Sequence, residues 1–398
     1  MNLPVSETSA PRVDRRADRA SAPPHVGTSI DRIAAVQVVA MLFPLASGLL
    51  LYGWRAAGLV AVMLISTYVA ARIWRRVGRR GRFIDMRGAL VSALLLSLLL
   101  PAHLLTLGTH GSAPWPILPG AAFTMVALMW LLGGSWRIHS VLLTYLLVFV
   151  PFQLLQPFLV PEFVLQNTRL LVGDLLHATD APDSFSITPW YRASPIDGAD
   201  ALRRPAVATQ LSLYTLGVQQ PDRAWTSMQM LIRDRLPPLE DLIVGGLPAA
   251  LGTGSAVGVV IGGLFLLYRG IIDWRIPLLT VLAAWIALLV LPVPIVITER
   301  GPVWQWLALR ESAAGWGVAM TFAHYELLAS PLLFVAFFLA TSPSIRPMSR
   351  RARTLYAALL GVCCAAAQLH VGASVGPIVA LAAVGLLTPV MDRVWKRP

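Results

Sequence analysis

The chain has 398 residues, of which 56% are hydrophobic and only 13% are charged. An ordinary soluble domain carries a charged fraction nearer to about a quarter. This composition, with a mean hydropathy of +0.67, therefore excludes that class and indicates an integral membrane protein. The formal net charge is +12, but many of the arginines cluster in short loops between apolar runs. Such clustering reports membrane topology, and we do not interpret it as nucleic-acid binding.

The apolar runs predict an all-α polytopic membrane protein with about ten transmembrane helices. Residues 1–31 are rich in Arg, Asp, Pro and Ser and lack a periodic apolar face, which predicts a disordered cytoplasmic arm. Runs of about twenty apolar residues are long enough to cross a bilayer as helices. The runs in chain order are 32–53, 56–74, 86–106, 115–133, 138–160, 250–268, 276–298, 318–341, 354–371 and 374–392.

A long polar segment, residues 161–245, separates the first five predicted spans from the last five. It is too long for a simple connector, and the alternation of the spans makes it external. We therefore expect a first transmembrane half, residues 32–160, and a second half with a short cytoplasmic tail, residues 246–398. This division, together with interrupted apolar runs near Pro101 and Pro248, favours an internal duplication with pseudo-symmetry.

The arginines orient the chain in the membrane. Seven of them lie between or beside the second and third predicted spans, from Arg72 to Arg87. Because basic residues concentrate in short cytoplasmic loops, we expect this loop and both termini in the cytoplasm, and residues 161–245 outside. The turn from Arg269 to Arg275 falls on the cytoplasmic side by the same alternation.

Several ionisable residues fall within predicted spans, where charge is costly and usually functional. They are His103, His139, His324, Glu326 and His370. One interpretation makes them an ion or proton relay, or part of a cofactor pocket. The other, which the sequence favours, makes His324 and Glu326 an interfacial pair that reaches water. Two facing histidines would also suit a haem, but no spacing singles out such a pair. Cys363 and Cys364, adjacent in an apolar run, are interpreted as small buried side chains.

The stretch from Asp241 to Pro277 carries the most specific motif of the chain. It reads DLIVGGLPAALGTGSAVGVVIGGLFLLYRGIIDWRIP. This pattern resembles the signature of the membrane flavoprotein subunits RnfD and NqrB. The resemblance continues in FVAFFLATSP, residues 334–343, and in LTPVMD, residues 387–392. Comparable elements in the first half extend it over nearly the whole chain after the N-terminal arm.

The resemblance implies a subunit of an ion-translocating redox complex in the bacterial inner membrane, relaying electrons through a covalent FMN. In that family a flavin transferase esterifies FMN to a threonine of an outside loop, in the motif Asp-x-x-Ser/Thr-Gly-Ala-Thr. Two threonines match parts of it, Thr209 in AVATQL and Thr188 in DSFSITP. We prefer Thr209, which keeps the Ala-Thr-x-Leu core. The resemblance also implies cofactor-binding roles for Gly252, Ser255, Trp274 and Arg275.

The resemblance implies partners too: other membrane subunits, a periplasmic electron carrier and the lipid bilayer. The sequence departs from the family at several polar positions. The family's Glu-Thr pair is replaced by Thr253 and Gly254, and the Asp of its Thr-Asp-Pro by Ser342. A flavin site needs a few well-placed polar groups in an apolar pocket. An alternative therefore stays open, in which the chain is a flavin-less scaffold or transporter that has kept the fold and lost the redox centre.

Overall fold

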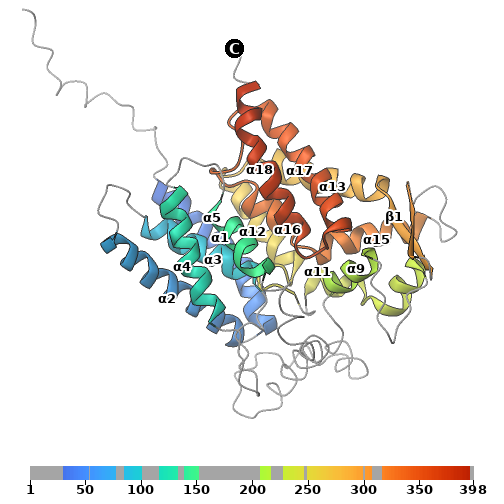
Figure 1. The fold of residues 1–398 in the computed structure, drawn as a ribbon, viewed down its shortest axis with the longest axis horizontal. Coiled ribbons are helices and arrows are strands. Elements are labelled where there is room, and N and C mark those ends of the chain that lie inside the picture. Colours follow the sequence, from blue (N-terminus) through green and yellow to red (C-terminus); the bar gives the residue numbers. More distant parts are fainter. Residues whose placement is uncertain are drawn as a thin grey trace, which may run out of the picture.

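The computed structural model describes residues 30–52, 54–77, 85–100, 116–132, 139–151, 207–216, 227–245, 249–298, 301–306 and 316–394. Within these stretches the fold is helical apart from one two-stranded antiparallel hairpin. Figure 1 shows the helices of the first half, in blue and green, beside those of the second half, in yellow to red. The arm 1–29 and the tail 395–398 lie outside the described residues, so the predictions for them stay predictions.

The described helices of the first half follow the predicted spans. They are α1 (Ile30–Tyr52), α2 (Trp54–Val77), α3 (Met86–Leu99), α4 (Ile117–Leu132) and α5 (Ser140–Thr144), which continues as the π-helical turn η3 (Tyr145–Phe149). Asp85 begins α3 as its N-cap, because its carboxylate accepts hydrogen bonds from the backbone N–H groups of Arg87 and Gly88 at 3.1 and 3.0 Å.

The second half is described almost continuously. Before it, the expected external segment contributes α9 (Val207–Thr215), α10 (Met228–Met230), η5 (Leu231–Arg235) and α11 (Leu239–Val244). The second half then comprises α12 (Ala256–Tyr268), α13 (Arg275–Val290), β1 (Val293–Thr298), β2 (Gly301–Gln305), α15 (Trp316–Ala329), α16 (Leu332–Phe334), η6 (Val335–Leu339), α17 (Arg350–His370) and α18 (Gly376–Val394).

Four of the described helices are long and apolar enough to cross a membrane. They lie at Ile33–Tyr52, Ala56–Arg76, Arg350–His370 and Gly376–Val394. A fifth span is formed if α15 and the segment Leu332–Leu339, which meet at a bend of 61°, count as one. The shorter apolar helices are Met86–Leu99, Ile117–Leu132, Ser140–Phe149, Ala256–Tyr268 and Arg275–Val290. This inventory supports a polytopic helical membrane protein.

One predicted span differs from the structure at its end. We expected a helix over 276–298, but α13 ends at Val290 and Val293–Thr298 is β1, whose Val293 lies opposite Gln305 of β2. The helix prediction was wrong for these residues. Pro292 and Pro294 follow directly after α13, and proline lacks an N–H donor and clashes with the preceding helical turn. The Val and Ile residues between and after them favour a strand.

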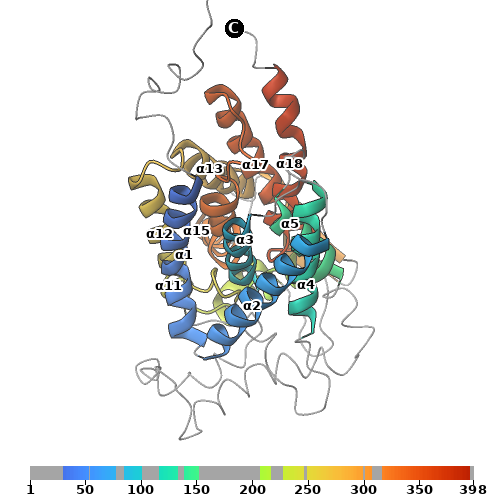
Figure 2. The same cartoon turned by 90° about the vertical axis from the view of Figure 1, so that its left-hand side faces the viewer.

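The two halves contact each other closely through α1 and α12. A Cβ on Gly258 would lie 2.6 Å from Oγ of Ser47, and one on Gly262 would lie 2.5 Å from the carbonyl oxygen of Ala40. Glycines at these two positions therefore allow the backbones to approach, as small residues do in membrane helix pairs. Figure 2 shows α1 and α12 lying together, with α17 and α18 beside each other further along the molecule.

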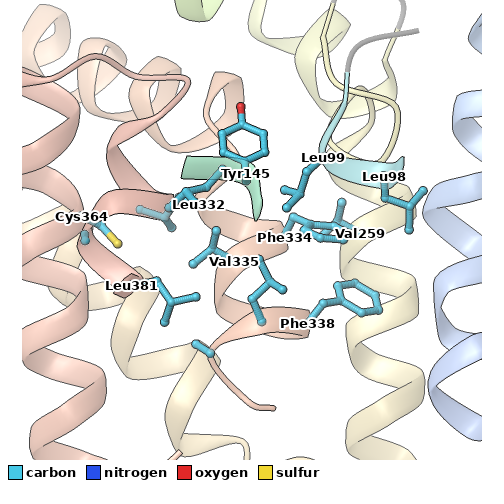
Figure 3. Packing of buried hydrophobic residues seen from close by; sticks show 14 of the residues in the cluster. Leu98, Leu99, Tyr145, Val259, Leu332, Phe334, Val335, Phe338, Cys364 and Leu381 are labelled. Carbon is cyan, nitrogen blue, oxygen red and sulfur yellow. The ribbon is translucent and has the colours of Figure 1, made fainter. Parts of the chain in front are cut away.

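The main buried cluster draws side chains from both halves. Figure 3 shows Leu98 and Leu99 of α3 and Tyr145 of η3 near residues of the second half. The second-half side chains labelled there are Val259, Leu332, Phe334, Val335, Phe338, Cys364 and Leu381. Cys364 is fully buried and Cys363 half-buried, which agrees with their interpretation as packing residues. One continuous core thus joins the two halves.

Candidate functional site

Thr209 lies on the exposed side of the short helix α9. It belongs to a helix rather than to a loop, and its side chain is exposed while Val207, Gln210 and Leu211 are buried. This pattern follows from helical periodicity, because only one face of α9 meets the rest of the protein. The side chain of Thr209 therefore lies on the face of α9 that the described residues leave uncovered.

The buried face of α9 is held by hydrogen bonds to distant segments. The hydroxyl of Tyr214 lies 2.9 Å from the carbonyl oxygen of Pro294 and 3.0 Å from that of Ile295, both in β1. The backbone N–H of Ala373, between α17 and α18, donates to Oγ of Ser212 at 2.8 Å. These bonds fix α9 against the hairpin and against the C-terminal end of α17, so the position of Thr209 is defined by the fold.

Thr209 fits the attachment of FMN in its chemistry. A phosphoester needs a hydroxyl that a transferase can reach, and Thr209 offers one on an anchored helix. Thr215 of the same helix is fully buried and its Oγ1 donates to the carbonyl of Ser212 at 3.2 Å, so it offers no comparable group. Thr188 lies outside the described residues and stays a prediction.

Gly252 and Ser255 lie in a turn that joins the halves. The N–H groups of Leu251 and Gly252 donate to the carbonyl oxygens of Leu100 and Leu98 at 2.9 and 2.7 Å. These bonds pair the end of α3 with the start of the Leu251–Ser255 turn, so the two interrupted apolar runs noted in the sequence meet. A Cβ on Gly252 would lie 2.7 Å from Cβ of Leu98, so a residue larger than glycine does not fit at this position without a shift.

Ser255 is buried and caps α12. Its Oγ accepts from the backbone N–H of Gly258 at 3.4 Å and donates to the carbonyl oxygen of Ile243 at the same distance. Gly245, at φ +103°, ends α11 in a conformation that only glycine adopts readily. The polar group of Ser255 is thus engaged within the protein, and the role that the structure gives it is helix capping.

Trp274 and Arg275 begin α13 beside an ion pair. The Arg275 guanidinium lies 5.8 Å from the ring centroid of Trp274, whose side chain is 56% exposed. The backbone N–H of Arg275 donates to Oδ1 of Asp273 at 3.3 Å, and Oδ2 of Asp273 accepts from Nη1 of Arg353 at 3.2 Å. The turn before α13 is therefore tied to the start of α17.

Further polar contacts connect this end of the protein. Arg353 also donates from Nε to the carbonyl oxygen of Pro347 at 3.0 Å, and the N–H of Met348 donates to Oδ1 of Asp392 at 2.9 Å. Nη1 of Arg346 donates to the carbonyl oxygen of Ile271 at 3.4 Å. Burial and the nearby Arg353 lower the pKa of Arg346, and Asp273 opposes that shift. This cluster holds α12, α13, α17 and α18 together at one end.

The structure distributes the residues assigned from the sequence over three places. Trp274 and Arg275, at the start of α13, lie near the N-terminal end of α17. The helix α9, which carries Thr209, is hydrogen-bonded to the turn after the C-terminal end of α17. The 21 residues of α17 correspond to about 30 Å. Gly252 and Ser255 precede the 13-residue helix α12, and Trp274 follows it. These residues do not converge on one pocket, and their cofactor-binding role stays a prediction.

The ionisable residues of the apolar runs occupy different environments. Glu326 is fully buried, so its interpretation as an interfacial residue that reaches water was wrong. His324 is exposed, and Nδ1 of its ring lies 2.6 Å from the carbonyl oxygen of Met320. His139 caps α5 by accepting from the N–H of Val141 at 3.3 Å. His370 is exposed and stacks on Trp304, and His103 lies outside the described residues.

Sequence reasoning missed the polar partners of Glu326. Gln368 of α17 donates from Nε2 to the carbonyl oxygen of Glu326 at 3.3 Å and to Oγ of Ser330 at 2.5 Å. Gln368 and Ser330 are themselves buried. A glutamine within an apolar run and a Ser-Pro step inside a predicted span are the sequence signals that mark these positions.

The described helices combine long apolar ones with shorter and bent ones, as in a multi-pass membrane protein. The comparison of sequences then places the chain within that class. It belongs to the NQR2, RnfD, RnfE family, whose model matches residues 19–398.

Individual relatives are distant but match along most of their length. The D subunit of the ion-translocating oxidoreductase complex of Halorhodospira halophila is 26% identical over 364 residues, 89% of this chain and 86% of the relative. The D subunit of the Na(+)-translocating ferredoxin:NAD(+) oxidoreductase complex of Acetobacterium woodii is 23% identical over 384 residues, 94% and 93% of the two chains. The D subunit of the ion-translocating oxidoreductase complex of Stutzerimonas stutzeri is 28% identical over 375 residues, 93% and 92%.

Proposed function

We propose that this chain is the D subunit of an ion-translocating electron transport complex and relays electrons through FMN esterified to Thr209. The family match over residues 19–398 and the names of the relatives support the complex. The observation that carries the flavin site is the exposed side chain of Thr209, a hydroxyl-bearing residue, on an anchored helix. Bound there, FMN would supply one- or two-electron transfer.

The residues of this chain would position the flavin rather than react. Tyr214 and Ser212 hold α9 to the hairpin and to the turn after α17, which limits how far an attached group can move. A defined attachment point matters because electron transfer to partners requires the flavin to stay within reach of them. The partners in this proposal are other membrane subunits of the complex and a periplasmic electron carrier.

The membrane arrangement in this proposal has ten spans in two halves of five. Residues 161–245 lie outside the bacterial inner membrane, and both termini lie in the cytoplasm. The concentration of arginine from Arg72 to Arg87 supports this orientation, and the described spans and shorter apolar helices support the count. A topology reporter fused at Arg79 tests the orientation, and an external signal from that fusion contradicts it.

A second candidate is a scaffold or transporter that carries no flavin. Ser255 caps α12 and Gly252 packs against α3, and these contacts account for both residue types without a cofactor, which favours the second candidate. In-gel flavin fluorescence after denaturation separates the two. The proposal predicts fluorescence in the wild type and in Thr209→Ser, which keeps the hydroxyl, and its loss in Thr209→Val, which has a similar shape without one. A non-fluorescent wild type made with a flavin transferase supports the second candidate.

A further inference from the structure

A buried carboxylic acid lies next to a break in the membrane region. Glu326 is in the last turn of α15, and its side chain has no exposed surface. The helix stops at Ala329 and resumes at Leu332, with a bend of 61° between the two segments. Pro331 has no N–H to donate to the preceding turn, which accounts for the interruption.

The break is stabilised from the neighbouring helix α17. The carbonyl oxygen of Glu326, in the last turn of α15, accepts a hydrogen bond from Nε2 of Gln368 at 3.3 Å. The same amide nitrogen donates to Oγ of Ser330 at 2.5 Å, and that Oγ accepts from the N–H of Leu332 at 3.3 Å. The backbone around Glu326 is therefore fixed by residues of both helices.

The acidic side chain itself has no partner. Oε1 and Oε2 of Glu326, and Oε1 of Gln368, are buried acceptors without a hydrogen bond among the described residues. An ionised carboxylate in this setting would have lost its hydration without compensation, at a cost of several kcal/mol. A bound proton removes the charge and turns one of the three acceptors into a donor.

The charged and titratable groups packed around α15 leave Glu326 unpaired. On α15 itself, Nδ1 of His324 faces the carbonyl of Met320, and the hydroxyl of Tyr325 donates to the carbonyl of Pro237. On the neighbouring elements, α13 has only Arg275 at its first residue, and α10, α16 and η6 have none. The remaining groups are Tyr214 on α9, Arg233, Asp234 and Arg235 on η5, Glu240 and Asp241 on α11, and Cys363, Cys364 and His370 in the C-terminal half of α17. None of the described side chains hydrogen-bonds the Glu326 carboxyl.

We propose that the Glu326 carboxyl is a proton-binding site within the membrane region, which takes a proton from the aqueous phase and returns it. The step is a simple acid dissociation, from carboxylic acid to carboxylate and proton, and needs no other reactant. Gln368 and Ser330 act as positioning residues that hold the broken helix around the acid. The inference of proton binding does not depend on the proposed function, whereas a role of this proton in ion translocation rests on it.

Labelling with the apolar carbodiimide N,N′-dicyclohexylcarbodiimide tests the proposal on the full-length purified chain. This reagent modifies protonated carboxyl groups in apolar surroundings, and peptide mass spectrometry locates the adduct. We expect the adduct on Glu326 at neutral pH, with none on the exposed Glu240 or on Asp273, which is paired with Arg353. The labelled fraction follows the protonated fraction, so it falls about tenfold per pH unit once the pH exceeds the pKa.

Infrared difference spectra provide a second readout that does not depend on access of the reagent. The carbonyl band of a protonated carboxylic acid should be present in the wild type, disappear as the pH rises and be absent from Glu326→Gln, which keeps the backbone carbonyl that Gln368 binds. If the labelling and the band persist at every pH, the proton is fixed and the proposal fails. It fails equally if no such band exists at neutral pH. Protection of Glu326 by sodium at constant pH would assign the site to a metal cation instead. None of these measurements requires flavin, so their failure is distinct from failure of the proposed electron relay.

Discussion

Gly252→Ala tests how the two halves are joined. In the structure the new Cβ would lie 2.7 Å from Cβ of Leu98, whereas ordinary contact begins at 3.4 Å, so the two atoms would be about 0.7 Å too close. Leu98 cannot simply move away, because its carbonyl oxygen accepts the Gly252 N–H at 2.7 Å and its side chain is fully buried. Overpacking of this kind costs about 1–3 kcal/mol, and loss of the hydrogen bond would add to it.

The assay is thermal unfolding of the detergent-solubilised protein, followed by the fraction that remains monodisperse. Gly120→Ala, in α4, is the matched control, because it is the same substitution and a Cβ there meets nothing within 4 Å. We expect Gly252→Ala to unfold at a clearly lower temperature, and Gly120→Ala to be unchanged or slightly stabilised, since alanine favours a helix over glycine. Equal unfolding temperatures for the two variants would refute the close pairing of α3 with the Leu251–Ser255 turn.

Three further substitutions test other contacts in the same assay. Ser255→Ala removes the N-cap of α12 and should cost about 1 kcal/mol; an unchanged unfolding temperature would show that the cap is dispensable. Asp273→Asn breaks the ion pair with Arg353 at 3.2 Å and should cost up to about 1 kcal/mol, with the difference from wild type shrinking in high salt; a salt-independent effect would argue against an ion pair. Gln368→Leu removes the hydrogen bonds to the Glu326 carbonyl and to Oγ of Ser330 and should cost about 1–3 kcal/mol. Val362 is exposed on the same helix, so Val362→Ala should change the unfolding temperature little. Equal effects of Gln368→Leu and Val362→Ala would contradict the role of Gln368.

Long apolar runs predicted the continuous helices well. The spans expected at 32–53 and 374–392 correspond closely to α1 and α18, although Pro44 and Pro389 lie inside these helices. Two other expected spans failed next to a proline. Pro292 and Pro294 convert the end of one run into a strand, and Pro331 divides another. Those signals are visible in the sequence, but whether a proline ends, bends or merely kinks a span depends on the partners around it.

The site was less predictable, because its contacts are distant in sequence. Nothing near Gly252 shows that its N–H will bond the carbonyl of Leu98, and nothing near Glu326 points to Gln368. The sequence marked Thr209 only through the motif around it. That its side chain is exposed follows from the burial of the opposite face of α9, with Tyr214 against β1, which only the fold determines. Local patterns therefore identified the candidate residues, and tertiary packing decided their surroundings.

Peptide mass spectrometry of the wild-type chain, made together with a flavin transferase and ample flavin, tests the central claim most directly. Trypsin separates the two candidate threonines, because Thr188 falls in the peptide 170–192 and Thr209 in the peptide 204–223. We expect an FMN adduct on the second peptide, located at Thr209 rather than at the buried Thr215. An adduct on the first peptide would move the flavin to Thr188, and unmodified peptides in both positions would contradict a covalent flavin in this chain.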